Sequence, residues 1–192
     1  MFVVDSNGQL NVFSANSAGK WTGPSTISPK DFAPSGAEIA VSQHFGVADQ
    51  TDVFVVDNHG QVNVFSVNGA GHWTGPQPIS PKDLSKSGAA LSASQNFGSA
   101  NQTELFLIDK NGLVNVFSTD STGQWAAPVT IGQPGLAPSG AFLVASPQFG
   151  VKNRTDLLVI SQAGTSGQGW PNAFWAGSTG GWLGPKELVN EI

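Results

Sequence analysis

Four asparagines stand out as residues that could bind a ligand, because each one interrupts an apolar segment. They are Asn11, Asn63, Asn115 and Asn172, and each lies two residues before a phenylalanine. An amide buried without hydrogen bonds costs a few kcal/mol, so each of these side chains needs partners. Two interpretations are open: each amide ties down the backbone of a neighbouring repeat, or each lines a pocket between repeats.

Tryptophans and small polar residues recur together with these amides. A tryptophan follows each asparagine at the same spacing, and serine, glutamine and phenylalanine recur before the next apolar segment. An indole face beside amides and hydroxyls can hold the apolar C–H surface of a sugar while its hydroxyls are hydrogen-bonded, although a tryptophan can also serve packing alone. The candidate carbohydrate-binding residues are Ser42, Gln43, Phe45, Asn63, Trp73, Ser94, Gln95, Phe97, Asn115, Trp125, Gln148, Asn172 and Trp182.

The histidines do not indicate a catalytic or metal-binding set. Each of His44, His59 and His72 occupies a repeat position that other residue types fill in the sister copies, as a variable surface position would. An enzyme would need a nucleophile, a base and a group that stabilises charge, or else a metal site. No carboxylate pair stands out either, so glycoside hydrolysis is the weakest of the functions considered. We expect a protein that is not an enzyme and has no cofactor and no bound metal.

Acidic residues recur at two further repeat positions. The set that opens short turns comprises Asp5, Asp57 and Asp109. A carboxylate at such a position accepts hydrogen bonds from the backbone amides of its own turn, so the sequence predicts a structural role there. The set that opens an apolar segment in three copies comprises Asp52, Glu104 and Asp156. These three either hydrogen-bond a neighbouring connector or face a ligand.

A repeat of 52 residues positions all of these side chains. Trp21, Trp73 and Trp125 are each 52 residues apart, and a fourth copy follows with a displacement of five further residues. Repeats of this length form arrays of small units that bury their faces against their neighbours. The copies cover about residues 1–35, 36–87, 88–139 and 140–192, and we expect them to form a single body over residues 1–192.

Each complete copy predicts a four-stranded antiparallel sheet. In the second copy the expected strands are residues 37–42, 52–57, 61–67 and 72–79, separated by turns that contain Gly or by short polar loops. Pro76 and Pro78 cannot donate to an interior ladder, so the fourth strand should lie at a sheet edge. The connector that follows is long enough to cross from the outermost strand of one sheet to the innermost strand of the next. Sheets joined in this way around an axis form a β-propeller, so the predicted fold class is all-β.

The first copy lacks its innermost strand, which leaves fifteen expected strands, one short of four whole blades. The two terminal blades would then each expose an apolar face. Three arrangements are open: the chain is a portion of a larger propeller, two chains complete one ring, or four blades close alone. We expect self-association, as a homodimer or a larger homo-oligomer.

The composition excludes several partners. Charged residues make up only 11% of the chain and the net charge is -5, so the surface should be mostly neutral and polar. Eight Lys and Arg residues without a basic cluster make a nucleic-acid partner unexpected, and no apolar run is long enough for a membrane span. The chain has no cysteine, and its start shows no secretory-signal pattern. The location, in the bacterial cytoplasm or after release, is left open.

The repeat resembles that of the Photorhabdus lectins, which are bacterial seven-bladed propellers that bind fucose. The resemblance rests on Asp-Val-Phe-Val-Val-Asp at 52–57, Asn-Val-Phe at 63–65, Gly-His-Trp-Thr-Gly-Pro at 71–76 and Ile-Ser-Pro-Lys-Asp at 79–83. It implies several equivalent sites between blades, with L-fucose and O-methylated sugars as ligands. The chain holds slightly more than half of such a ring. The Arg and Glu that grip fucose in the six-bladed fungal lectins have no repeated counterpart here.

These observations together predict a multivalent lectin that recognises fucosylated or O-methylated glycans in pockets between blades. Several weak sites on one rigid body would raise avidity without any new contact. The alternative is a structural or protein-interaction propeller fragment that binds no sugar, including one engineered to test propeller assembly.

Overall fold

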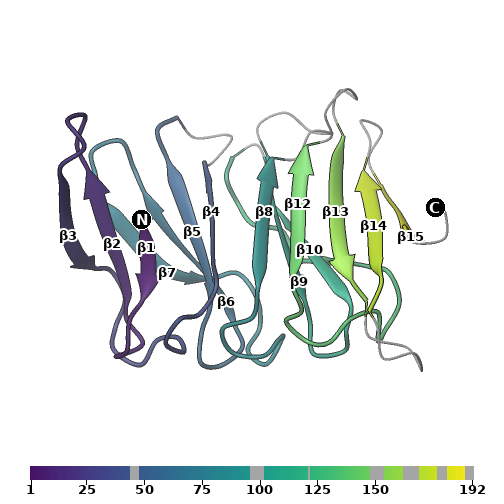
Figure 1. Cartoon of the computed structure of the whole chain (residues 1–192). Helices are drawn as coiled ribbons and strands as arrows, with labels where there is room; N and C mark the ends of the chain where they lie inside the picture. Colours follow the sequence, from purple (N-terminus) through teal and green to yellow (C-terminus); the bar gives the residue numbers. More distant parts are fainter. Residues whose placement is uncertain are drawn as a thin grey trace.

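The computed structural model describes residues 1–43, 48–95, 102–120, 122–147, 154–161, 169–176 and 181–188. These ranges contain fifteen strands in four antiparallel sheets. Figure 1 shows the four sheets side by side, from β1–β3 at the N-terminal side to β12–β15 at the C-terminal side. We call them blades 1 to 4. The prediction of an all-β fold with four blades is confirmed. No helix long and apolar enough to cross a membrane occurs in the described ranges.

The strands lie close to their predicted positions. Blade 1 contains β1 (Phe2–Val4), β2 (Leu10–Ala15) and β3 (Trp21–Thr26). Blade 2 contains β4 (Ile39–Gln43), β5 (Thr51–Val56), β6 (Val62–Val67) and β7 (Trp73–Pro78). Blade 3 contains β8 (Leu91–Gln95), β9 (Thr103–Ile108), β10 (Val114–Ser118) and β11 (Val129–Ile131). Blade 4 contains β12 (Leu143–Pro147), β13 (Thr155–Ile160), β14 (Pro171–Ala176) and β15 (Trp182–Glu187).

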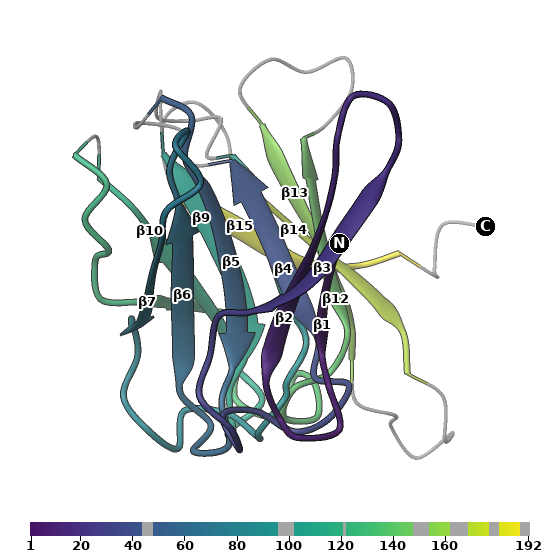
Figure 2. The same ribbon diagram turned by 90° about the vertical axis from the view of Figure 1, so that its left-hand side faces the viewer.

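Within each sheet the strands follow one another in chain order. Blades 2 to 4 have four strands each, whereas the described part of blade 1 has three, in the order β1-β2-β3. The first strands of the complete blades, β4, β8 and β12, are neighbours, so they form the inner edge of the array. The proline-containing strand β7 lies at the opposite, outer edge of its sheet, as predicted. Seen from the blade 1 end (Figure 2), the blades fan apart around this inner edge.

The core consists of three apolar layers, one between each pair of adjacent blades. Strand β5 shows how the sequence specifies them: Val53 and Val55 pack toward blade 1, while Phe54 and Val56 pack toward blade 3. All four side chains are fully buried. A strand covered on both faces therefore reads as a continuous apolar run, and each buried side chain of this size contributes about 1.5–3 kcal/mol.

The connectors fix each blade to the next one. Asn58, in the turn between β5 and β6, donates its backbone amide to Phe32 O (2.9 Å) and its side-chain amide to Asp31 O (2.7 Å) in the preceding connector. One repeat later, the backbone amide of Lys110 donates to Leu84 O at 2.8 Å. We call the interface between two adjacent blades a seam. These repeated bonds hold each seam in a defined geometry, which any site between blades requires.

Candidate functional site

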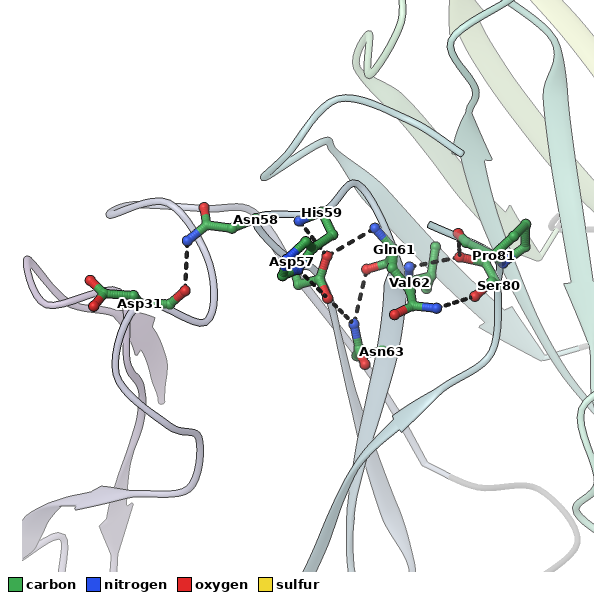
Figure 3. Close-up of polar contacts among 9 residues, drawn as sticks. All are labelled: Asp31, Asp57, Asn58, His59, Gln61, Val62, Asn63, Ser80 and Pro81. Atoms are coloured by element: carbon green, nitrogen blue, oxygen red, sulfur yellow. Dashed lines mark hydrogen bonds and ion pairs between the residues drawn. The ribbon is translucent and has the colours of Figure 1, made fainter. Parts of the chain in front are cut away.

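The turn between β5 and β6 is held by an aspartate and an asparagine (Figure 3). Oδ1 of Asp57 accepts hydrogen bonds from the backbone amides of His59 (2.8 Å) and Gln61 (3.0 Å). Nδ2 of Asn63 donates to Asp57 Oδ2 (3.1 Å) and to Gln61 O (3.0 Å). The predicted structural role of the turn aspartates is thus confirmed, and the amide of Asn63 finds its partners in the same turn.

Blades 1 and 3 have the same hydrogen bond between an asparagine and a turn aspartate. Nδ2 of Asn11 donates to Asp5 Oδ2 at 2.9 Å, and Nδ2 of Asn115 donates to Asp109 Oδ2 at 3.1 Å. The hydrogen bond from the Gln9 backbone amide is the main cause that lowers the pKa of Asp5. In blade 4, Nδ2 of Asn172 donates to the backbone oxygen of Trp170 at 2.9 Å.

These bonds correct one sequence-based interpretation. The four asparagines Asn11, Asn63, Asn115 and Asn172 are at most 7% exposed, and their amides bond within their own blade rather than to a neighbouring blade's backbone. The physical reason is local: strand and turn form a hairpin, so the asparagine side chain reaches back to its own hairpin. Its partner is the turn aspartate in blades 1 to 3 and a backbone oxygen in blade 4.

The outer tryptophans pack across the seams between blades. Trp73 of blade 2 contacts Phe2 of blade 1 edge to face, with ring centroids 5.9 Å apart. The equivalent contacts in the next two seams join Trp125 to Phe54 at 5.4 Å and Trp182 to Phe106 at 5.3 Å. Each such pair contributes about 0.5–1.5 kcal/mol beyond the area it buries. The three tryptophans remain half-buried, so part of each indole is still accessible.

The serine and glutamine pairs do not join the tryptophans of their own blade. Ser42 and Gln43 end β4 at the inner edge of blade 2, while Trp73 lies on β7 at the outer edge, with two strands between them. Ser42 is 8% exposed and donates its hydroxyl to Gln43 O at 3.0 Å.

In blade 3, Ser94 and Gln95 likewise lie on the inner-edge strand β8, apart from the outer tryptophan Trp125. Ser94 is 8% exposed and Gln95 ends β8; the side chain of Gln95 is not among those described. Of the remaining predicted residues, Phe45, Phe97 and Gln148 lie outside the described residues.

A cavity of about 400 Å³ opens at the outer edge of the seam between blades 2 and 3. Its polar lining includes Gln61, Gln77, Ser80 and Gln124, and its apolar lining includes Trp125 and prolines of both blades. Gln61 is oriented by a hydrogen bond from its Nε2 to Ser80 O at 2.6 Å (Figure 3), whereas Gln77 and Gln124 are exposed. The arrangement places amide donors and acceptors next to an indole.

The cavity between blades 2 and 3 adjoins a departure from the repeat. In blade 2, Gly75 has a φ of 107°, and a Cβ there would meet Val64 O at 2.7 Å. Gly23 and Gly184 adopt the same conformation in blades 1 and 4. Blade 3 has Ala127 at this position, which cannot approach the neighbouring strand in that way. Its outer strand therefore begins only at Val129, and residues 126–128 line the cavity instead.

Gln61, Gln77 and Gln124 are not among the binding residues predicted from the sequence. Their types change between repeats, so they do not stand out as a repeated set. The signal that could have located them is Ala127-Pro128, which stands where each of the other three copies has a Gly-Pro dipeptide.

A second cavity, of about 450 Å³, lies at the seam between blades 1 and 2. The residues that line it include Phe2, Phe13, Ser14, Trp21, Thr51 and Trp73. Both cavities therefore adjoin the outer tryptophan of the following blade, one on Trp73 and the other on Trp125.

The carboxylates that begin the second strand of each blade differ in how they are compensated. Asp52 accepts hydrogen bonds from Ser66 Oγ (2.7 Å) and Gln50 Nε2 (2.9 Å). Asp156 pairs with Arg154, Nε to Oδ1, at 2.9 Å. Glu104 is 4% exposed, and its Oε2 has no hydrogen-bond partner among the residues that the structure describes. Burial raises the pKa of Glu104 to about 7.

Nothing in the described part of the chain groups three or more His, Asp or Glu side chains as a metal site would require. His59 lies 3.8 Å from Asp57, Nδ1 to Oδ2, on a side chain that is 63% exposed. That pair belongs to the turn described above, where the carboxylate is already occupied by backbone amides.

Comparisons with known proteins give a consistent result for the fold. No protein-family model matches the chain, and no curated protein matches it. Among solved structures, the BP39L lectin from Burkholderia pseudomallei is 44% identical, with a TM-score of 0.92 over 97% of this chain and 51% of that chain.

Two fungal structures share the fold at lower identity. The Aleuria aurantia lectin, solved in complex with alpha-methyl-L-fucoside, is 15% identical with a TM-score of 0.66, over 98% of this chain and 55% of that chain. A mutant of AofleA from Arthrobotrys oligospora is 13% identical with a TM-score of 0.55, over 96% of this chain and 66% of that chain. The chain spans about half the length of the Burkholderia lectin, and its repeated four-stranded blades are similar to the corresponding part of that lectin.

Proposed function

We propose that this protein is a non-enzymatic lectin that binds fucose or a related O-methylated sugar at the seams between its blades. The observation that carries the proposal is the cavity between blades 2 and 3, which Gln61, Gln77 and Gln124 line together with Trp125. The similarity to a bacterial lectin supports carbohydrate binding, and the fungal lectin of the same fold was solved with a fucoside.

The chemistry of the cavity suits a neutral sugar. Glutamine amides can donate to and accept from ring hydroxyls, and the indole of Trp125 offers an apolar surface to the C–H groups. The described residues that line this cavity include no charged side chain, so the ligand need not carry a charge. A cavity of about 400 Å³ is large enough for one monosaccharide.

The expected affinity of a single site is low. At about 0.3–0.5 kcal/mol per non-hydrogen atom, a monosaccharide of about a dozen such atoms binds with a Kd in the submillimolar to millimolar range. Several sites on one rigid body compensate for this weakness, so we propose that recognition of glycans is multivalent. We also propose that the chain self-associates, which increases the number of sites per particle.

The serine and glutamine pairs at the inner edge form a second, separate candidate surface, on Ser42, Gln43 and Ser94. The two surfaces can be distinguished by one pair of variants. Gln77→Val introduces the residue that blade 3 carries at the same repeat position, Val129, and removes an amide from the outer cavity. Gln43→Val makes the same chemical change at the inner edge, on a side chain that is also exposed.

Calorimetric titration with alpha-methyl-L-fucoside and with an O-methylated fucose tests the proposal. Loss of one ligand hydrogen bond, about 1–1.5 kcal/mol, should weaken binding by about 5- to 10-fold in Gln77→Val and leave Gln43→Val unchanged. The reverse pattern would place the site at the inner edge. Absence of binding to either sugar at millimolar concentration would instead favour a structural or protein-interaction role.

A further inference from the structure

The chain contains three Asn-Gly dipeptides, at residues 7–8, 68–69 and 111–112. Asparagine followed by glycine is the dipeptide most prone to spontaneous deamidation, because glycine has no side chain to hinder the backbone nitrogen that attacks the asparagine amide. The reaction requires a backbone amide that can lose its proton and a turn that is open to water. The three dipeptides differ in both respects.

The first and third dipeptides occupy the same repeat position, in the turns between β1 and β2 and between β9 and β10. In each turn the glycine amide is already a hydrogen-bond donor. Gly8 N donates to Asp5 O at 3.0 Å, and Gly112 N donates to Asp109 O at 3.1 Å. Both glycines are buried under a connector, and a Cβ on Gly8 would meet Ala33 O at 2.6 Å. The attacking nitrogen is therefore hydrogen-bonded and shielded from water in both turns.

The second dipeptide lies in the turn between β6 and β7, which is open to solvent. Asn68, Gly69 and Ala70 are all exposed. Among the hydrogen bonds that join described residues, none has the backbone amide of Gly69 as its donor. Attack by this nitrogen therefore requires no hydrogen bond to the glycine amide to be broken.

The same turn also activates the side-chain amide that is attacked. Oδ1 of Asn68 accepts hydrogen bonds from the backbone amides of Ala70 (3.0 Å) and His72 (3.1 Å). When the Gly69 nitrogen adds to Cγ of Asn68, negative charge develops on this oxygen. The two backbone donors stabilise that charge, as the donors of an oxyanion hole do.

We propose that Asn68 is a site of spontaneous deamidation in the folded protein and that it reacts ahead of Asn7 and Asn111. The Gly69 nitrogen loses its proton to solvent and forms a bond to Cγ of Asn68. The bond from Cγ to Nδ2 then breaks, and Nδ2 leaves as ammonia after taking up a proton. Water opens the resulting succinimide ring to aspartate, or to isoaspartate, in which the main chain continues through the side chain.

The corresponding turn of blade 3 shows that the fold accepts the aspartate product. Asp120 occupies the repeat position of Asn68, and its Oδ1 accepts hydrogen bonds from the backbone amides of Thr122 (2.8 Å) and Gln124 (3.0 Å). The aspartate product therefore keeps the turn and adds one negative charge to a chain whose net charge is -5. The isoaspartate product instead adds a methylene group to the main chain shortly before Trp73, which begins β7.

Peptide mapping by mass spectrometry gives the first test, on the folded chain incubated at neutral pH. Deamidation replaces NH2 by OH, so the mass of each peptide reports the extent of reaction at its own asparagine. The same chain unfolded in guanidinium chloride supplies the intrinsic rate of each dipeptide, by which the rate in the folded chain is divided. We expect the resulting ratios at Asn7 and Asn111 to be at least about tenfold below the ratio at Asn68, the factor that corresponds to breaking one hydrogen bond. Similar ratios at all three sites, or no reaction at Asn68 in the folded chain, would overturn the proposal.

The corresponding turn of blade 1 offers a matched variant. Oδ1 of Asn16 accepts the same two hydrogen bonds, from the backbone amides of Ala18 (3.0 Å) and Lys20 (3.0 Å), but Ser17 follows it in place of glycine. Ser17 is exposed, so Ser17→Gly removes no packing contact from the core. We expect this variant to deamidate at Asn16 at a rate close to that of Asn68. An Asn16 that stays unreactive in the variant would refute the role of the turn.

Ion-exchange chromatography tests the assignment to Asn68 in the intact chain. The wild type should accumulate a more acidic form with time, and Asn68→Asp, which has no asparagine at this position, should accumulate at least about tenfold less of it. A variant that becomes acidic as fast as the wild type would place the reaction elsewhere and overturn the proposal. None of these measurements uses a sugar, so their outcome is independent of whether the chain proves to be a lectin.

Discussion

Glu104 is the carboxyl group whose charge the fold compensates least, and its replacement by glutamine should stabilise the protein above pH 7. In blade 3 it occupies the position of Asp52 and Asp156, which have hydrogen-bonded or charged partners. Glu104 has neither in the described contacts: its Oε2 is buried without a partner. An isolated buried carboxylate is unfavourable, because it loses hydration without compensation.

The magnitude follows from the pKa. Burial raises the pKa of Glu104 from 4.5 to about 7, so between these values the folded state holds a proton that the unfolded state releases. The free energy of unfolding therefore falls as the pH rises through this window, and the loss is complete above pH 7. Each pKa unit corresponds to about 1.4 kcal/mol, so the cost approaches about 3 kcal/mol at pH 8 and is under about 1 kcal/mol at pH 5.

Urea denaturation at pH 5 and pH 8, at one fixed protein concentration, measures this cost. Glutamine keeps the shape of the side chain and cannot ionise. The difference in unfolding free energy between Glu104→Gln and the wild type should therefore shift in favour of the variant by about 2–3 kcal/mol from pH 5 to pH 8. Comparing variant with wild type cancels the titration of the histidines and of the other carboxylates.

Asp52→Asn serves as the matched control in blade 2. Asp52 accepts hydrogen bonds from Ser66 and Gln50, so its replacement should lower the stability at both pH values by about 1–3 kcal/mol. The reasoning about Glu104 would be refuted if Glu104→Gln showed no pH-dependent gain, or if it behaved like the control.

Two further predictions concern the turn and the cavity. Asn63→Ala should lower the unfolding free energy by about 1–2 kcal/mol, because Asp57 loses a buried partner, and it should leave fucoside affinity unchanged. A variant that keeps its stability in urea but loses fucoside affinity would show that Asn63 belongs to the binding site. Ala127→Gly should let the outer strand of blade 3 extend toward Trp125, as the outer strands of the other blades do. Calorimetry should then show fucoside binding weakened by about tenfold or more. Unchanged affinity would mean that this cavity is not the binding site.

The repeat in the sequence is sufficient to predict most of the fold. Asp57 predicts its turn because its carboxylate can accept hydrogen bonds from the backbone amides of a Gly-containing turn. Pro76 predicts an outer strand because proline has no backbone N–H to donate to an interior ladder. The continuous apolar run at 52–57 predicts a strand covered on both faces. The structure confirms all three, because each depends on local chemistry that the neighbouring blades do not alter.

The candidate site is harder to predict, because it depends on departures from the repeat. Repetition draws attention to Asn63 and its equivalents, yet those amides are repeated because the turns are repeated. The cavity between blades 2 and 3 is lined by Ala127, which replaces the glycine that the other outer strands have at this position. Gln77 lines the same cavity, and no pattern within its own repeat indicates it.

The same limit applies to Glu104. Its repeat position holds a carboxylate in three blades, so the sequence groups it with Asp52 and Asp156. The difference between them depends on partners that come from other strands, such as Ser66, and on how deeply the longer side chain is buried. The spacing of residues along the chain gives neither the hydrogen-bond partners nor the burial of a side chain.

The central claim is that the chain binds sugar at the outer edge of the seam between blades 2 and 3. It is tested most directly by titrating the protein with alpha-methyl-L-fucoside and following the indole region of a ¹H–¹⁵N correlation spectrum. We expect the indole signal of Trp125 to shift and saturate, while that of Trp175, which lies under Arg154 away from the cavity, stays in place. Saturable shifts that leave the Trp125 signal unmoved, or a spectrum that does not change at millimolar fucoside, would contradict it.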